Sequence, residues 1–239
     1  MILRLRALAL LVPLIVGACA PPSVAPGQMQ AIKRVAVMSA IGDKFTVKKI
    51  GFTVFGNEEK DFPIDSWGID EFVIGKVRGV LAGRLDVRPV AYQKSAFNTT
   101  GNNFDKIVEI VRGQATSTDI DAYIIVTKGG SQYASTNQGL YGLGIMEHSA
   151  LGTAVYLYAL YWMTVVDGHK FTVIANTPAF PLSQTVLAMT AIRGPSRELD
   201  KSWMPETLRA TQNLRLKSAV TELLDRNLPG TIENLKLLQ

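Results

Sequence analysis

The chain has 239 residues, of which 47% are hydrophobic and 19% are charged, and this balance is typical of a folded domain rather than of a disordered segment. The formal net charge at pH 7 is +5 and is scattered along the chain, so the composition gives no indication of nucleic-acid binding. A single cysteine excludes an internal disulfide, so a hydrophobic core must stabilise the fold.

Residues 1–18 have the pattern of an export signal. Arg4 and Arg6 provide a basic start, an apolar segment runs from Ala7 to Val16, and Gly17 and Ala18 are the small residues that a signal peptidase requires. The apolar segment is shorter than the ~20 residues of a membrane-spanning helix, so a permanent span is the weaker interpretation. Removal of the two arginines with the signal lowers the formal charge to +3.

The sequence Val16-Gly17-Ala18-Cys19 resembles the lipobox of bacterial lipoproteins. The resemblance implies that diacylglycerol is attached to the thiol of Cys19 and that cleavage makes this cysteine the first residue. An incidental cysteine beside an ordinary cleavage site is the alternative. Ala20 stands where many lipoproteins of the inner membrane have aspartate, so the resemblance favours the outer membrane, with the protein facing the periplasm.

The residues after the signal divide into a tether and a domain. Residues 19–32 comprise Cys19 and a proline-rich segment, in which Ala20 to Gly27 reads APPSVAPG. Such linkers run extended at about 3.1 Å per residue, so the tether can hold the domain away from the lipid. We expect residues 33–239 to form one globular domain, since this length suits a single core.

The periodicity of apolar residues predicts an α+β, α/β-like domain with a single mixed sheet and two or three packed helices. Strands are predicted over residues 33–41, 44–55, 85–92 and 121–128. Amphipathic helices are predicted over residues 65–84 and 103–114, and the charged residues 57–63 are predicted to form a turn or loop.

The second half of the domain is predicted to hold a long hairpin and a C-terminal helix. The apolar run from Thr153 to Val166 predicts a buried strand, and Asp167-Gly168 suits a two-residue turn into a strand from Lys170 to Asn176. Pro205 suits the first turn of the closing helix, which we expect to end at Pro229-Gly230.

Three glycines recur every four residues in the helix predicted over 65–84: Gly75, Gly79 and Gly83. A row of glycines removes side chains from one ridge and lets another backbone approach closely. Charged residues in the same helix argue against a membrane span, so we expect the row to pack against the sheet of this protein. An interface between copies of the chain is the alternative.

Residues 129–152 form the least regular stretch and provide the candidate interaction residues Tyr133, Asn137, Tyr141 and Leu143. Aromatic residues among small polar ones are typical of loops that bind partners, although a flexible hairpin tip fits equally well. The glycines are in the wrong order for a phosphate cradle, and Glu147-His148 lacks the further ligands of a zinc site. We therefore expect no cofactor and no metal.

The order of these elements resembles the plan shared by three kinds of envelope protein. They are the amino-terminal domain of the Tol translocation protein, the curli secretion lipoprotein and the lipoprotein activators of penicillin-binding proteins. The resemblance covers about residues 33–227, and it is one of pattern without an invariant motif. It implies the fold and a role other than catalysis, and the chain departs from it in its glycine-rich stretch.

Three functions follow from the sequence. The leading one is a non-enzymatic, lipid-anchored adaptor or regulator that is held on the membrane by lipid on Cys19 and binds another envelope protein. The alternative is an oligomeric secretion or assembly component resembling the curli lipoprotein. A hydrolase is least favoured, because no nucleophile, base and orienting acid can be assembled from the sequence.

Overall fold

The computed structural model describes residues 29–51, 56–115, 119–133, 138–149, 153–179, 192–205 and 214–237. Cys19, the export signal and residues 20–28 of the predicted tether lie outside these ranges, and so does Asn137.

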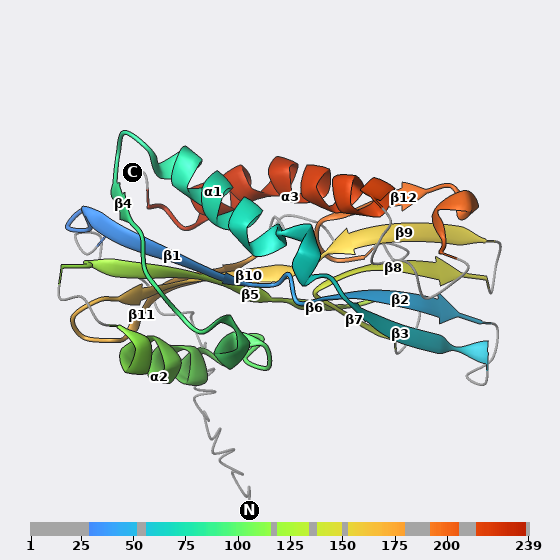
Figure 1. Cartoon of the computed structure of the whole chain (residues 1–239), viewed down its shortest axis with the longest axis horizontal. Coiled ribbons are helices and arrows are strands. Elements are labelled where there is room, and N and C mark those ends of the chain that lie inside the picture. Colours follow the sequence, from blue (N-terminus) through green and yellow to red (C-terminus); the bar gives the residue numbers. More distant parts are fainter. Residues whose placement is uncertain are drawn as a thin grey trace, which may run out of the picture.

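Two five-stranded sheets lie end to end along the long axis of the molecule (Figure 1). Sheet A has the order β11-β10-β5-β1-β4 and contains β1 (Arg34–Ala40), β4 (Asp86–Arg88), β5 (Ala122–Lys128), β10 (Tyr161–Asp167) and β11 (Val173–Pro178). Sheet B has the order β12-β9-β8-β2-β3 and contains β2 (Lys44–Ile50), β3 (Glu58–Pro63), β8 (Leu143–His148), β9 (Ala154–Ala159) and β12 (Ser196–Leu199). A separate two-stranded sheet joins β6 (Gly130–Gln132) to β7 (Gly139–Tyr141).

The prediction of a single mixed sheet is wrong, because the strands are interrupted along one line between the two sheets. We call this line the seam; it contains residues 41–43, Gly129, Gly142 and Leu160. Backbone hydrogen bonds cross it, from the amide of Gly129 to the carbonyl of Leu160 at 2.9 Å and from the amide of Leu160 to the carbonyl of Gly142 at 2.8 Å. A Cβ atom at position 129 would lie 2.9 Å from the amide nitrogen of Tyr161, so glycine permits this approach.

The charged segment predicted as a loop over 57–63 is the edge strand β3, paired antiparallel with β2. Lys44 pairs with Asp61 and Lys48 with Glu59 across the two strands. Acidic residues and lysine have low strand propensity, which hides this strand in the sequence. Charges on an edge strand also oppose pairing with another chain.

Helices cover both faces of sheet A (Figure 1). Helix α1 (Ile69–Leu81) and helix α3 (Leu214–Asn234) lie on one face, and α3 extends over sheet B as well; helix α2 (Phe104–Gln114) lies on the other face of sheet A. The helices predicted over 65–84 and 103–114 are thus confirmed. The side-chain oxygen of Asn103 accepts a hydrogen bond from the amide of Lys106 at 3.1 Å and caps α2. Short 3-10 helices cover Asp65–Trp67, Lys94–Phe97 and Lys201–Trp203.

The predicted end of the last helix at Pro229-Gly230 is wrong, since α3 continues to Asn234. Proline cannot donate the amide hydrogen bond to the carbonyl four residues earlier. Leu228 and Ile232 are both fully buried on either side of Pro229, so the apolar contacts of this turn outweigh the lost bond.

The long hairpin is present, but it differs from the prediction in two details. The predicted strand from Thr153 to Val166 is divided at Leu160 into β9 and β10. The turn into β11 is longer than two residues, since β10 ends at Asp167 and β11 begins at Val173. The Asp167 carboxylate accepts hydrogen bonds from the amides of His169 and Lys170 within this turn, each at 2.8 Å.

The largest core lies between α1, α3 and the facing sides of both sheets, and a second core lies between α2 and sheet A. In the part of the chain that the structure describes, no helix has the length and apolar character needed to cross a bilayer.

Candidate functional site

The glycine row does not pack on the sheet, so this expectation is wrong. Gly75 and Gly79 are exposed on α1, and a Cβ atom at either position would meet no described atom within 4 Å. Gly83 lies beyond the end of the helix with φ of +83°, which glycine adopts without strain. The row therefore leaves an open stripe on the surface of α1.

The structure separates the predicted interaction residues instead of gathering them in one loop. Much of the stretch from 129 to 152 is ordered as β6, β7 and β8, so its prediction as irregular is wrong. Leu143 and Tyr133 are buried, whereas Tyr141 is 39% exposed at the end of β7. Of the three candidates that the structure describes, Tyr141 alone presents a large surface; Asn137 is outside the described residues.

Tyr133 belongs to an aromatic group on sheet B. Its ring centroid lies 5.1 Å from that of His148 and 6.1 Å from that of Tyr156, and its backbone forms a bridge with Ile192. Burial raises the pKa of the Tyr133 hydroxyl. These contacts give Tyr133 a packing role that its position among small polar residues does not indicate.

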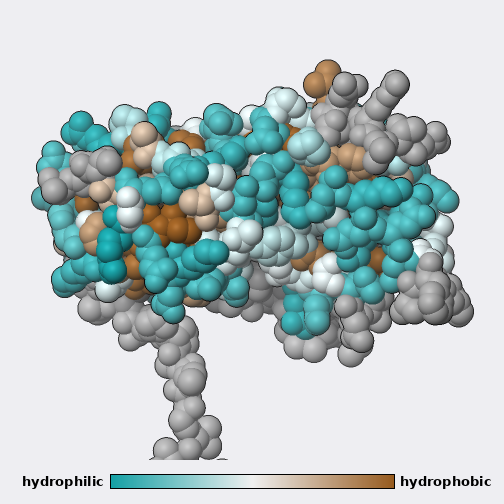
Figure 2. Space-filling view, turned by 60° about the horizontal axis from the view of Figure 1, so that its bottom comes forward, coloured by the Kyte–Doolittle hydropathy of each residue, from teal (hydrophilic) through white to brown (hydrophobic). Residues whose placement is uncertain are grey.

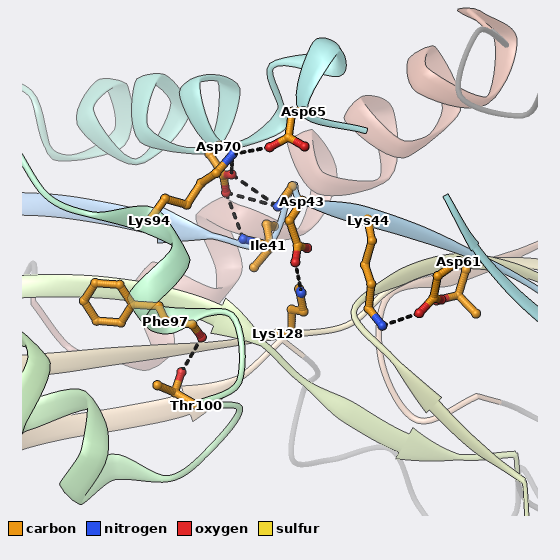
Figure 3. Close-up of polar contacts among 12 residues, drawn as sticks. Ile41, Asp43, Lys44, Asp61, Asp65, Asp70, Lys94, Phe97, Thr100 and Lys128 are labelled. Atoms are coloured by element: carbon orange, nitrogen blue, oxygen red, sulfur yellow. Dashed lines mark hydrogen bonds and ion pairs between the residues drawn. The ribbon is translucent and has the colours of Figure 1, made fainter. Parts of the chain in front are cut away.

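A buried carboxylate holds the turn between β1 and β2 at the seam (Figure 3). Asp70, in the first turn of α1, is 1% exposed and accepts hydrogen bonds from the Ser39 hydroxyl at 2.7 Å and the Ile41 amide at 2.8 Å. The Gly42 amide approaches both of its oxygens, at 3.2 and 3.3 Å. A Cβ atom on Gly42 would lie 2.9 Å from Cβ of Ile69, so the turn and the helix pack too closely for a side chain.

Lys94 provides the positive charge beside this carboxylate. Its ammonium group lies 3.0 Å from Asp70 and 3.1 Å from Asp65 (Figure 3). Burial disfavours the charged ammonium, but the hydrogen bonds and attraction to the two carboxylates outweigh it and raise the pKa of Lys94. The network joins α1, the β1–β2 turn and the segment before α2.

Two further ion pairs lie beside the seam (Figure 3). Lys128 is buried and donates to Oδ2 of Asp43 at 2.6 Å, while Oδ1 of Asp43 is buried without a hydrogen-bond partner among the described residues. Lys44 donates to Asp61, which also accepts from the Thr46 hydroxyl at 2.6 Å. Burial opposes ionisation of Asp61, but the bonds from Lys44 and Thr46 outweigh it and lower the pKa of this carboxyl.

Tyr141 lies beside these charges. A Cβ atom at Gly101 would lie 2.8 Å from the Tyr141 hydroxyl, and one at Gly130 would lie 3.4 Å from its ring, so two glycines make room for the side chain. Burial raises the pKa of its hydroxyl, the Lys44 charge opposes this and the Asp43 charge adds to it. The seam thus presents one exposed aromatic ring beside paired charges, a combination suited to contact with another protein.

Other surface features are less concentrated. A shallow groove of about 300 Å³ lies between α1 and α3 and is lined by Phe72, Lys76, Ser218, Thr221, Glu222 and Asp225. Seen from the side of α2, the surface is mostly hydrophilic, and its most compact apolar area is in the half that contains sheet A (Figure 2). No group of three or more histidine, cysteine, aspartate or glutamate side chains suited to a metal occurs among the described residues.

Asp70 and Lys128 were not among the candidates from the sequence. A signal was present for Asp70, because it precedes Val73 and Val77 on the buried face of the predicted helix, where a carboxylate needs hydrogen-bond partners. Its position in the first turn of the helix by itself indicates only a favourable interaction with the helix dipole. Lys128 ends a buried apolar strand, and the sequence does not reveal its partner Asp43, 85 residues away.

Comparison with known proteins shows distant similarity in structure alone. No protein-family model matches the chain, and no curated protein sequence is significantly similar to it. A PelC dodecamer from Paraburkholderia phytofirmans has 14% identity, with coverage of 83% of this chain and 87% of that chain and a TM-score of 0.29. A variant of that dodecamer gives 13% identity, coverage of 82% and 86%, and a TM-score of 0.28.

A third similar structure is protein XCC0632 from Xanthomonas campestris, of family DUF330. It has 10% identity, with coverage of 85% of this chain and 87% of that chain and a TM-score of 0.30. At these identities and TM-scores, the similarity transfers neither an assembly state nor an activity to this chain.

Proposed function

We propose that this chain is a lipid-anchored envelope protein that faces the periplasm from the outer membrane and acts by binding another envelope protein, without catalysis. The observation that carries the proposal is the lipobox-like Val16-Gly17-Ala18-Cys19 after a basic and apolar start. A proline-rich tether follows it, and the folded domain begins a few residues later, with β1 starting at Arg34. This order suits a domain that works at a distance from its membrane.

Tyr141 is the residue that we propose to contact the partner. It combines a ring that is 39% exposed with a position beside the Asp43–Lys128 and Lys44–Asp61 pairs. Tyrosine is enriched in protein interfaces because it adds a large apolar area and a hydroxyl at a small entropic cost. The neighbouring charges would fix the orientation of the partner more than they would add affinity.

The first test is the covalent and native mass of the full-length protein extracted from the envelope in mild detergent. We expect the covalent mass to correspond to residues 19–239 with lipid on Cys19, and a native mass of a monomer or dimer. A mass without lipid would contradict the anchor. A ring of many copies would replace the adaptor with the second function below.

The second test is capture of the partner in intact envelopes by a photo-crosslinking amino acid at position 141. We expect crosslinks there and few at Lys60, an exposed residue on the edge strand β3. Tyr141→Ala should weaken capture with little change in stability, while Tyr141→Phe reports on the hydroxyl alone. Unchanged capture by Tyr141→Ala would remove this residue from the interface. Tyr133→Ala is unsuitable, because Tyr133 is buried.

The second candidate function is a component that assembles with copies of itself for secretion or assembly. The open positions of Gly75 and Gly79 on α1 favour it, since they allow another backbone to come close. Gly79→Leu should then abolish the oligomer while the fold stays intact. Gly113→Leu is the matched control, because Gly113 is an equally open glycine on α2. Equal effects of the two substitutions would contradict a role for the α1 row.

A further inference from the structure

The start of β1 is fixed by the Asp121 side chain. Oδ2 of Asp121 accepts hydrogen bonds from the backbone amides of Lys33 at 3.0 Å and Arg34 at 2.8 Å. Oδ1 accepts from the Arg34 guanidinium at 3.2 Å, and the amide of Asp121 donates to the Arg34 carbonyl at 2.8 Å. We call Asp121 with Lys33 and Arg34 the clamp.

Further contacts from neighbouring segments fix the chain at the clamp. The Lys33 carbonyl accepts a hydrogen bond from the Asp86 amide at 2.8 Å, and Ile32, just before the clamp, is buried in the core beneath α1 and α3. His169, from the turn after β10, lies 3.7 Å from Asp121. Met29 packs against the same core, so the chain is part of the packed domain from the first described residue onward.

The clamp lies at one end of the long molecule. β1 and β5 begin there and β10 ends there, because β1 and β5 are parallel and β10 is antiparallel to β5. β2 continues away from β1 and ends at Ile50, beside Ser149 at the opposite end (Figure 1). At about 3.3 Å per residue, the path from Arg34 to Ile50 covers at most about 53 Å, since residues 41–43 lie outside both strands.

The tether is short compared with this length. Nine residues, 20–28, separate Cys19 from the first described residue, and a proline-rich chain spans about 28 Å over them. Residues 29–31 form a turn, in which the amide of Ile32 donates to the carbonyl of Met29 at 3.3 Å, so they add little to the reach of the tether. The clamped end of the domain can therefore lie no farther from the lipid than the length of the tether, whereas the opposite end can lie farther away by the length of the domain.

We infer that the clamp makes the β1 end of the domain the membrane-proximal end and directs the outer end of sheet B, with Ile50 and Ser149, away from the membrane. The inference rests on the lipid anchor of the proposed function. It deepens that function by naming the part of the domain that reaches farthest into the periplasm. Release of the clamp lengthens the tether at the expense of β1 and weakens this orientation.

Energy transfer to the lipid tests the orientation in the full-length, lipidated protein in vesicles of phosphatidylethanolamine and phosphatidylglycerol. Lipid on Cys19 leaves the chain without another thiol, so a donor dye on one introduced cysteine is unique. Thr172→Cys, in the exposed turn beside the clamp, and Ser149→Cys, exposed at the outer end, are matched small hydroxyl positions. With an acceptor dye on the lipid, we expect severalfold higher transfer from position 172 than from position 149.

Asp121→Ala tests the clamp itself. In this variant we expect faster hydrogen exchange at the amides of Lys33 and Arg34, and lower energy transfer from the dye at position 172 to the lipid. Unchanged hydrogen exchange in the buried strand β5 would show that the variant is folded. Asp119→Ala removes a neighbouring, 81% exposed carboxylate and should change neither readout. Equal transfer from positions 172 and 149 in the lipidated wild type, or unchanged exchange in Asp121→Ala, would overturn the inference. A covalent mass without lipid would instead contradict the proposed function.

Discussion

Replacement of Asp70 by alanine tests whether the network at the seam stabilises the fold. The substitution leaves three buried donors without their acceptor: the Ser39 hydroxyl and the amides of Ile41 and Gly42. It also leaves the Lys94 ammonium with Asp65 alone. A buried donor left unsatisfied costs about 1–3 kcal/mol, whereas Lys94, whose side chain is 30% exposed and still paired with Asp65, adds less. Since these effects are not additive, we expect the free energy of unfolding to fall by about 3–5 kcal/mol.

Urea unfolding of the detergent-solubilised mature protein, followed by tryptophan fluorescence, measures this change. Trp67 is a suitable reporter, because it is buried with its ring centroid 5.3 Å from that of Phe45, close to the network. Asp225→Ala is the matched control: Asp225 also pairs with a lysine from another helix, but its side chain is 44% exposed. We expect the control to lose less than about 1 kcal/mol. Equal losses in the two variants would refute the assignment of stability to the buried network.

Three further predictions concern single contacts. Gly144→Ala should destabilise the fold by about 1–3 kcal/mol, because the added methyl group would lie 2.5 Å from the carbonyl oxygen of Thr46 and 2.2 Å from the hydroxyl of Tyr158. Thermal unfolding measures this change, and an unchanged melting temperature would contradict the packing. Asp43→Ala should cost more stability in urea than Lys128→Met. The first leaves an ammonium that is only 3% exposed without its partner, whereas the second leaves a carboxylate that is 19% exposed and better reached by water. The reverse order would refute the argument. Burial opposes ionisation of Asp121, but the hydrogen bonds from Arg34 and Lys33 outweigh burial and lower the pKa of this carboxyl. The ionised carboxylate therefore stabilises the fold above pH 3.8, and this stabilisation is lost as the pH falls below that value. The stability difference between the wild type and Asp121→Asn should therefore be largest near neutral pH and shrink in acid, and a difference that grows in acid would contradict the shift.

The helices and most strands could be predicted from the sequence, because their information is local. Helix α1 combines an apolar stripe with acidic residues in its first turn, and β5 is a compact run of apolar residues. Both signals lie within about ten residues and need no knowledge of distant neighbours. The charged strand β3 has no such local signal, because its stability comes from the lysines of β2 across the ladder.

The division into two sheets could not be predicted, because it depends on several breaks that meet in space. Gly42, Gly129 and Leu160 are far apart in the sequence, and each break alone resembles an ordinary loop or an irregularity within a strand. Their alignment follows from pairing between strands that are distant in the chain, which sequence periodicity does not contain. The same long-range pairing brings Asp43 to Lys128 and places Tyr141 near the charges of Lys44 and Asp43.

The glycine row on α1 can be explained in two ways: as a local loss of helix stability that the fold tolerates, or as a surface that serves in assembly. Glycine in a helix costs about 0.5–1 kcal/mol relative to alanine, and neither Gly75 nor Gly79 has a positive φ or a close neighbour that would require it. The double substitution of both by alanine should therefore raise the free energy of unfolding of the monomer by about 1–2 kcal/mol.

Native mass measured on the same double variant decides between the two functions. If copies of the chain pack along the row, two added methyl groups hold the backbones apart, and the more stable variant should dissociate at concentrations at which the wild type remains assembled. A stabilised variant with an unchanged native mass would leave the row without a role in assembly and leave Tyr141 as the surface to test. A destabilised variant would contradict the open positions that the structure assigns to both glycines.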